Sequence, residues 1–294
     1  MDMQKSWPLI GVLTLFGSFN SYAETVYSAW NLEWLSSTPS TKFKPSQREE
    51  PDYQSLSRHF ESMNSDVVAF QEVNDVSALQ RVIGNEYQIF FSHRAKPKNQ
   101  HHQFSDINQY TGFAVKNGVS VIDKPDIRLD TSRNSKLRYA SYIVVDSDSE
   151  QPIHTLSVHL KARCSGAYKS NKSCRTLKAQ GEMLNDWIQK RETNGDAYII
   201  LGDFNHNLNY KGDWLWADIS ENSNAILATK KTEAKCKVKS RNNPDKTHQF
   251  RSLIDHIIVS SNLSFSSPWQ DLYKIDDVLN NQMSDHCPVS TVIK

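Results

Sequence analysis

The sequence has almost no net charge, because 34 lysine and arginine residues are balanced by 33 aspartate and glutamate residues, which leaves +1. A strongly basic chain would indicate a nucleic-acid partner through its overall potential. Here any attraction to a polyanion has to come from local patches. The charge balance therefore neither supports nor excludes DNA as a substrate.

The chain also lacks internal repeats, long linkers and low-complexity blocks. A length of 294 residues is enough to bury a sizeable core, and it would permit one large domain or two small ones. The composition is ordinary for a globular protein, with 38% hydrophobic and 23% charged residues. Because no boundary signal divides the chain, we predict one domain over residues 24–294.

No apolar run reaches the roughly 20 residues that a membrane-spanning helix needs. The N-terminal apolar stretch, residues 7–19, is shorter; it follows Lys5 and precedes Ser21-Tyr22-Ala23, which offers small residues to a signal peptidase. We therefore predict a signal peptide over residues 1–23 and a secreted or periplasmic protein without stable membrane association. An uncleaved N-terminal anchor is the alternative.

Cysteine is scarce: the chain has four cysteines and no C-x-x-C pair, which argues against a zinc site. An even number in an exported chain predicts two disulfides. Cys164 and Cys174 flank a short loop, whose closure would stabilise the fold by about 3 kcal/mol in the chain-entropy model. This pairing leaves Cys236 with Cys287, although four cysteines allow three connectivities.

Predicted strands that alternate with predicted helices along the chain indicate an α/β fold. Apolar spacing predicts helices over residues 47–63 and 173–191. Short β-branched runs predict strands over residues 25–31, 67–73, 111–115, 139–145, 153–159, 198–203 and 253–259.

Polar residues end several of these apolar runs. They are Asn31 in AWNLEW, Glu72 in FQEV, His159 in SVHLK, Asp203 and Asn205 in GDFN, and Asp285 with His286 in SDHCPV. Buried strands of this kind deliver their polar ends to one face, where carboxylate, amide and imidazole groups can hold a metal and a phosphate. The pattern predicts a metal-dependent phosphodiesterase.

Together with Asp255 in LIDH, this ordered set resembles the endonuclease/exonuclease/phosphatase superfamily, whose members include pancreatic deoxyribonuclease. The resemblance extends over roughly residues 25–294. It implies a four-layer α/β sandwich, in which helices flank two packed mixed β-sheets, and it implies a secreted, deoxyribonuclease-like member of bacterial type.

The resemblance also implies roles for the site residues. Glu72, with Asn31 and Asp285, would hold the metal, which we expect to be Mg²⁺, with Mn²⁺ or Ca²⁺ as alternatives. Asp203 would orient or deprotonate the attacking water. Asn205 would bind the scissile phosphate, although an ordinary Asp-Asn turn after a strand is the competing interpretation. A carboxylate paired with an arginine or lysine is the alternative for Glu72.

Two histidines complete the expected chemistry. Asp255 and His286 resemble a dyad in which the carboxylate fixes the histidine tautomer. His159 resembles the histidine that binds phosphate or protonates the leaving oxygen. The sequence does not decide which histidine is the acid and which is the base. His256 should face the other side of its strand and serve packing.

Basic residues suggest where a substrate strand would lie. Arg138 matches in position an arginine that contacts substrate phosphate, with a rim salt bridge as the alternative. We also expect Lys161, Lys235 and Lys237 to contact substrate, the latter two within the lysine-rich segment 230–241, for which an ordinary solvated loop is the alternative. A second basic loop covers residues 93–102 and could hold a substrate strand beside the site. Neither loop interleaves aromatic residues, so base stacking is not predicted.

The preferred interpretation is a secreted, monomeric, metal-dependent DNA endonuclease without sequence selectivity. A sphingomyelinase or other phospholipid phosphodiesterase on the same scaffold is the leading alternative, and it would need an exposed apolar hairpin. Trp214 and Trp216 are the only candidates, and both suit the packing of a short helix better. A binding module or toxin subunit would be expected to have lost site residues, and none is missing. The choice between DNA and RNA and the product ends stay open.

Overall fold

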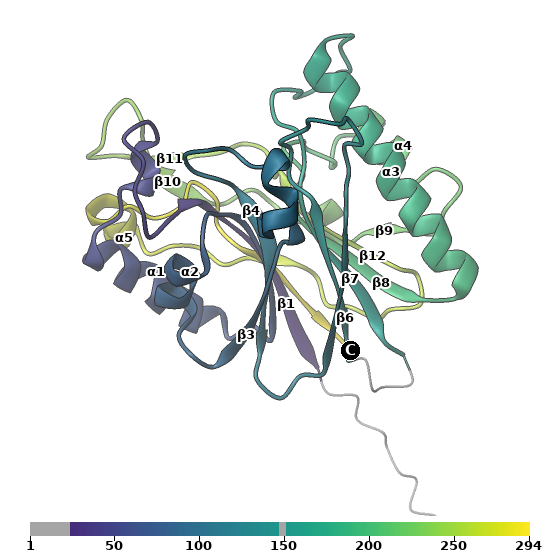
Figure 1. The fold of residues 1–294 in the computed structure, drawn as a ribbon, viewed down its shortest axis with the longest axis horizontal. Coiled ribbons are helices and arrows are strands. Elements are labelled where there is room, and N and C mark those ends of the chain that lie inside the picture. Colours follow the sequence, from purple (N-terminus) through teal and green to yellow (C-terminus); the bar gives the residue numbers. More distant parts are fainter. Residues whose placement is uncertain (1–23, 147–150) are drawn as a thin grey trace, which may run out of the picture.

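A computed structural model describes residues 24–146 and 151–294 of the chain. The predicted signal peptide lies outside the described residues. The fold contains two large β-sheets packed face to face, with helices on both outer sides (Figure 1). This arrangement confirms the predicted four-layer α/β sandwich.

The first sheet carries the N-terminal strand in its interior. Its strands β1 and β2 are parallel and their neighbours are antiparallel, so the sheet is mixed. In spatial order the strands are β13 (Trp269–Gln270), β14 (Val289–Ile293), β1 (Thr25–Leu35), β2 (Val67–Val73), β4 (Tyr110–Lys116) and β3 (Tyr87–Phe91).

The second sheet is mixed in the same way, with β7 and β8 parallel and β12 antiparallel to β8. Its spatial order is β5 (Val121–Ile127), β6 (Ala140–Val145), β7 (Ile153–His159), β8 (Ala197–Asp203), β12 (Asp255–Val259) and β9 (Ile226–Leu227). A separate two-stranded ribbon, β10 (Lys237–Lys239) with β11 (Thr247–Gln249), belongs to neither sheet.

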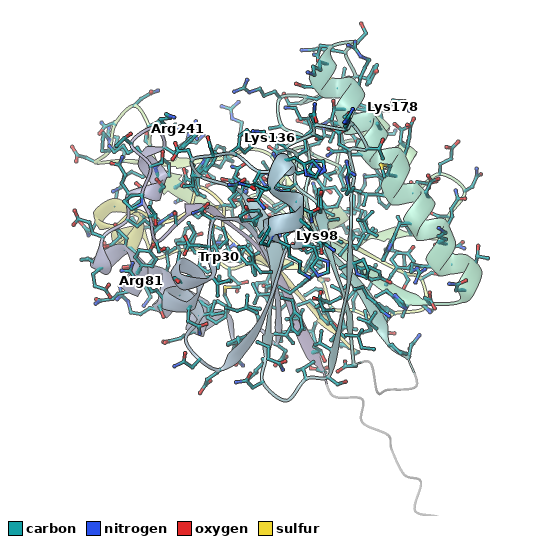
Figure 2. The ribbon with its side chains drawn as sticks, viewed as in Figure 1. Trp30, Arg81, Lys98, Lys136, Lys178 and Arg241 are labelled. Carbon is teal, nitrogen blue, oxygen red and sulfur yellow. A yellow bond between two sulfur atoms is a disulfide. The ribbon has the colours of Figure 1, made fainter. Side chains whose placement is uncertain are left out.

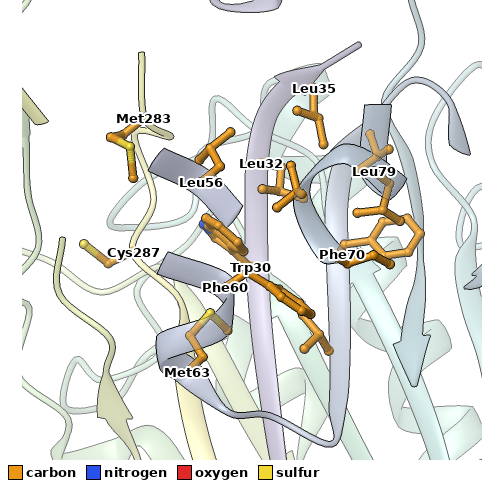
Figure 3. Close-up of a cluster of buried hydrophobic side chains, with 14 of the residues drawn as sticks. Trp30, Leu32, Leu35, Leu56, Phe60, Met63, Phe70, Leu79, Met283 and Cys287 are labelled. Atoms are coloured by element: carbon orange, nitrogen blue, oxygen red, sulfur yellow. The ribbon is translucent and has the colours of Figure 1, made fainter. Parts of the chain in front are cut away.

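Three apolar clusters hold the layers together. The central cluster joins the facing sides of the two sheets and includes Tyr27, Phe113 and Ile199. A second cluster packs the first sheet against its helices around Trp30, Leu56 and Phe60 (Figure 3). A third packs the second sheet against the long helix α3. Burial on both faces explains why β8 reads as an uninterrupted apolar run.

The helices divide between the two outer sides. In Figure 1, α1 (Glu50–Met63), α2 (Val76–Ile83) and α5 (Ile275–Asn280) lie beside the first sheet, while α3 (Lys172–Asn194) and α4 (Trp214–Ile219) lie beside the second. Short 3-10 turns are η1 (Lys44–Ser46), η2 (His93–Ala95), η3 (Pro97–His102) and η4 (Ala228–Lys231). No helix within residues 24–146 or 151–294 is long and apolar enough to cross a membrane.

Local signals explain where the two predicted helices begin and end. Helix α1 starts at Glu50, later than predicted, because Glu49 and Asp52 form a capping box at that point. Helix α3 runs from an Asn171 cap to the left-handed Gly195, so it is longer than predicted at both ends.

Both predicted disulfides are present, Cys164–Cys174 and Cys236–Cys287. The first closes the loop before α3. The second ties the base of the β10–β11 ribbon to the residue that follows His286.

Candidate active site

Strand pairing brings the predicted motifs to one edge of both sheets. In the first sheet Asn31 of β1 is in register with Gln71, next to Glu72 on the parallel strand β2. In the second sheet His159 of β7 is in register with Asp203 of β8, and Asp203 with Asp255 of β12. The carboxyl ends of the parallel strands lie at this edge and antiparallel β12 begins there, so five strands deliver polar side chains to the same place.

Asn31 joins the two sheets at this edge. Its side-chain amide Nδ2 donates to Asp203 Oδ2 at 3.0 Å and to Glu72 Oε1 at 3.3 Å. His159 Nε2 lies 3.5 Å from Glu72 Oε1 and 3.4 Å from Asp203 Oδ2. Both neighbours are acceptors, so the proton of neutral His159 belongs on Nε2. Burial, and then the charge of Arg138, lower the pKa of His159 well below its usual range.

His286 and Asp255 form the predicted dyad. His286 Nδ1 lies 2.8 Å from Asp255 Oδ2, which leaves His286 Nε2 facing Asp203 Oδ2 at 3.9 Å and Asp285 Oδ1 at 3.7 Å. Burial opposes a charge on His286, but the carboxylates of Asp255, Asp203 and Asp285 outweigh it and raise its pKa well above the usual range. His286 is therefore cationic at neutral pH.

The GDFN segment forms a tight turn around Asp203. A Cβ on Gly202 would lie 2.1 Å from a backbone oxygen of β7, and Gly202 has a φ of +142°, so only glycine fits. The chain then turns instead of staying extended, since Asn205 has a left-handed φ of 52°. The Asn205 amide nevertheless meets Asp203, with Nδ2 donating to Oδ2 at 3.1 Å and the backbone N–H donating to Oδ1 at 2.7 Å.

The donor set at this edge fits a divalent cation. Ligand atoms of Glu72, His159 and Asp203 lie within 4.8 Å of one another, as do those of Asp203, Asp255 and His286. Burial raises the pKa of Glu72, and burial with the charge of Asp255 raises the pKa of Asp203 to about 7. Buried carboxylates this close are unfavourable unless a cation neutralises them, and oxygen-rich sets favour Mg²⁺ or Mn²⁺.

Glu72 also has a strained backbone. Its φ of 58° is left-handed, and the pairing of β2 with both neighbouring strands shifts register around it. A non-glycine residue there costs about 1–3 kcal/mol, and such positions concentrate at functional sites. In this conformation the Glu72 side chain meets Asn31 and His159.

The family model that describes the Endonuclease/Exonuclease/phosphatase family matches residues 28–286. The chain belongs to this family. Members of the family are hydrolases that act on phosphoester bonds. No curated protein sequence matches the chain.

Solved structures share the fold of this endonuclease/exonuclease/phosphatase chain at low identity. An endonuclease/exonuclease/phosphatase from Bacteroides vulgatus superposes with a TM-score of 0.64 at 14% identity, covering 93% of this chain and 99% of that one. Truncated TDP2 of Caenorhabditis elegans gives 0.60 at 16%, with 92% and 98% covered. The mannosyl-6-phosphatase Bt3783 of Bacteroides thetaiotaomicron gives 0.60 at 11%, with 92% and 99% covered. At these identities the likeness shows the fold.

Asp285 lies at the rim of this endonuclease/exonuclease/phosphatase site. It touches His286 and forms an ion pair with Arg241 at 3.2 Å, and it belongs to neither compact ligand group. Beside it is Glu33, which the sequence analysis missed: Glu33 Oε2 accepts from the Asp285 backbone N–H at 3.0 Å. Burial, followed by the charge of Asp285, raises the pKa of Glu33 to about 8. The sequence feature that could have identified Glu33 as a site residue is its position two residues after Asn31.

The predicted substrate contacts differ in position. Arg138 is next to the site, where its guanidinium donates to the carbonyls of His159 and Leu160. Lys161 lines a groove of about 1040 Å³ between residues 129–137 and α3. Lys235 is instead paired with Glu233 at 2.9 Å, and Lys237 is exposed on β10; neither lines this groove or contacts a site residue among the described parts of the chain.

Several other expectations concern packing. His256 is fully buried, accepts from Leu208 N–H at 3.2 Å and meets Thr229, as predicted for a packing residue. In the basic loop 93–102, Arg94 is buried and donates to the carbonyls of His102 and Gln109. Arg94 therefore stabilises the loop, whereas Lys96, Lys98 and His101 are exposed, and their contact with a substrate strand stays a prediction.

A second buried dyad was also missed. His206 Nε2 lies 2.7 Å from Asp213 Oδ2, and His206 Nδ1 lies 2.8 Å from the Cys164 carbonyl. Both side chains are almost fully buried. This dyad connects the turn after GDFN to the disulfide loop.

Proposed function

We propose that the protein is a divalent-metal-dependent phosphodiesterase that cleaves DNA without sequence selectivity. The observation that carries the proposal is the convergence of Asn31, Glu72, His159 and Asp203 with the Asp255–His286 dyad at one edge. All the groups that phosphodiester hydrolysis needs, an activator for water, donors for developing charge and ligands for a cation, are together there.

The charges of the site residues suggest which catalytic role each residue has. Asp203 has a pKa of about 7, which suits a general base at neutral pH. His286 is cationic and its Nε2 faces Asp203, so it donates to the phosphate and stabilises the charge that develops in the transition state. Asp255 keeps His286 charged and oriented.

The remaining residues would bind and position the phosphate and the cation. Asn205 Nδ2 and neutral His159 Nε2 point at Asp203, where they can donate to phosphate oxygens once substrate is bound. Glu72, with Asn31 beside it and Asp285 and Glu33 at the rim, would hold the divalent cation. When bound, the cation neutralises the phosphate oxygens and lowers the barrier to attack.

Local charge supports a polyanionic substrate. Lys161 shares its groove with Lys136, Lys172 and Arg175, and together these cations outnumber the acidic Asp130, Glu182 and Asp186 of the same groove. Lys161 also lies close to Arg138. Burial, then the charges of Arg138, Arg163 and Lys172, lower the pKa of Lys161, which reflects a concentration of positive charge beside the site. Such a groove attracts a nucleic-acid backbone. We propose that the protein acts as a secreted monomer after removal of residues 1–23.

A phospholipid phosphodiesterase is the second candidate. Trp214 and Trp216 pack against the third cluster, as expected. However, Trp269, Leu272 and Ile275 are 37%, 48% and 42% exposed within one short segment, and they could contact a lipid surface.

Parallel incubation with supercoiled plasmid, RNA and sphingomyelin, with Mg²⁺ or with a chelator, tests both candidates. We expect chelator-sensitive plasmid nicking that disappears in Glu72→Ala and persists in Glu61→Ala, since Glu61 is exposed on α1. Lipid hydrolysis with an intact plasmid would assign the second candidate. Inactivity on all three substrates would contradict the proposal.

A further inference from the structure

A pocket of about 770 Å³ opens beside the candidate active site, between the β10–β11 ribbon and residues 278–285. We call it the ribbon pocket. Glu33 and Asp285 form its inner end, and Asp285 Oδ1 is 3.7 Å from His286 Nε2. A group held in the ribbon pocket is therefore within reach of a phosphate bound at His286.

The floor of the ribbon pocket is apolar. Val238, Val278 and Met283 belong to the cluster around Trp30 and are 6%, 1% and 5% exposed; Met283 is labelled in Figure 3. One wall carries an aromatic pair: Phe250 is 40% exposed, and its ring meets His248 edge to face, with the centroids 5.1 Å apart. The open ring surface and the floor can cover the faces of a flat apolar group.

The rim is polar. The side-chain amides of Asn242 and Asn281 have no hydrogen-bond partner among residues 24–146 and 151–294. Lys44 and Lys239 stand at the same rim, together with Arg241, which is paired with Asp285 and lies toward the same upper edge of the molecule as Lys136 in Figure 2. The pocket thus offers free donors and acceptors beside positive charge.

We propose that the ribbon pocket binds the nucleobase next to the scissile phosphate and makes the protein prefer unpaired over duplex strands. The inference rests on the proposed function. A nucleobase has apolar faces for the floor and Phe250, hydrogen-bonding edges for the free amides, and adjacent phosphates for the rim cations. An acyl chain would leave these amides and cations unused.

The requirement for an unpaired base follows from the shape of the site. A paired base has its edges engaged and its faces stacked, so it must leave the duplex before it can enter a walled pocket. Supercoiled plasmid would then be cut where it opens transiently. Basic residues alone did not predict this preference, because His248 and Phe250 follow the lysine-rich segment in sequence and join it only in the folded ribbon.

The outer wall is fixed to the active site. Cys236–Cys287 holds the base of the ribbon next to His286, and the Arg241–Asp285 ion pair holds its tip. Gln270 Oε1 accepts the backbone N–H groups of Lys235 and Cys236 at 2.6 and 3.0 Å. The pocket is therefore built in advance of substrate, which limits the ordering cost of binding.

The test compares a short single-stranded oligonucleotide with the same strand in a duplex, using the oxidised protein with Mg²⁺. We expect the wild type to have the higher kcat/KM on the single strand. Phe250→Ala should lower that value by about tenfold, mainly through KM, since a stacked base is lost. Phe104→Ala is the matched control, because Phe104 is 52% exposed and does not line the pocket.

Binding of the labelled single strand in chelator gives a second readout that does not depend on chemistry, and it should weaken in Phe250→Ala alone. Equal behaviour of Phe250→Ala and Phe104→Ala, or a wild-type preference for duplex, would overturn the pocket assignment while the nuclease function stands. Competition by mannose 6-phosphate that Phe250→Ala abolishes would reassign the pocket to carbohydrate. A wild type that cleaves no nucleic acid would instead overturn the proposed function.

Discussion

Replacing Asp255 by asparagine keeps the size of the side chain but removes the charge that faces His286. Asp255 is 5% exposed, and its Oδ2 lies 2.8 Å from His286 Nδ1, so the hydrogen bond is shielded from water. A hydrogen bond to a charged group contributes about 1.5–3 kcal/mol. Removing the charge makes protonation of His286 less favourable by about this amount, so we expect the pKa of His286 to fall.

The same substitution should impair catalysis. An asparagine can turn its NH₂ group toward Nδ1 and favour the wrong tautomer, and a neutral His286 no longer stabilises the developing charge. We expect turnover on plasmid to fall by about 10²–10⁴-fold. The assay pairs nicking rates with the titration of the histidine ring signals by NMR in the metal-free protein.

Asp213→Asn provides the control, because it makes the same change in the buried dyad with His206. Asparagine also caps α4, whose first turn Asp213 caps, so the helix should survive. Turnover should stay at the wild-type level in this variant. Wild-type turnover in Asp255→Asn, or an unchanged His286 titration, would refute the assigned dyad.

Three further predictions concern stability. Gly202→Ala should destabilise the fold by about 2–5 kcal/mol in urea unfolding, because the added Cβ meets a backbone oxygen at 2.1 Å and the left-handed φ is strained; Gly195→Ala, with open space around its Cβ, should cost less. Replacing Cys236 and Cys287 by serine should lower the free energy of unfolding by about 4 kcal/mol, since the bridge closes a separation of 51 residues. A loss no larger than the one caused by removing Cys164–Cys174 would contradict this. In chelator, the contribution of Asp203 to the free energy of unfolding should be fully present below pH 3.8 and should be lost as the pH rises to about 7, because the folded state retains a proton that the unfolded state releases. Thermal melts across this range should show the decline, and Mg²⁺ should reverse it.

Much of the fold was predictable because buried strands have continuous apolar runs. Strands β1, β2, β7 and β8 are covered on both faces, and their ends carry the site motifs, so one pattern predicts both. Strands β3 and β5 were not predicted, because both are half-exposed edge strands and β5 is interrupted by Pro125. Burial on a single face leaves a weaker signal in sequence. Strand β14 was also not predicted: it is buried, but Ser290 and Thr291 interrupt its apolar run.

The parts of the site that escaped prediction depend on distant contacts. The role of Glu33 in the site depends on its contact with Asp285, which is far away in sequence. The density of positive charge in sequence predicts Lys235 and Lys237 as substrate contacts, whereas Lys239 and Arg241 line the ribbon pocket. The direction in which the ribbon faces is set by its disulfide and by packing against α5, and the sequence pattern carries neither.

The bond from Asn31 to Asp203 spans the two sheets, and Ser284 Oγ donates to the Asn31 carbonyl across 253 residues of chain. Contacts between such distant segments close slowly during folding. The second sheet takes its strands from residues 121–259 and can form, with Trp187 packed against it, before these bonds. The first sheet pairs β1 with β14 across the chain, so it is completed by contacts as distant as those of the site. Enzymatic activity during refolding would therefore report the completion of the first sheet and its docking, and it would lag behind the fluorescence of Trp187.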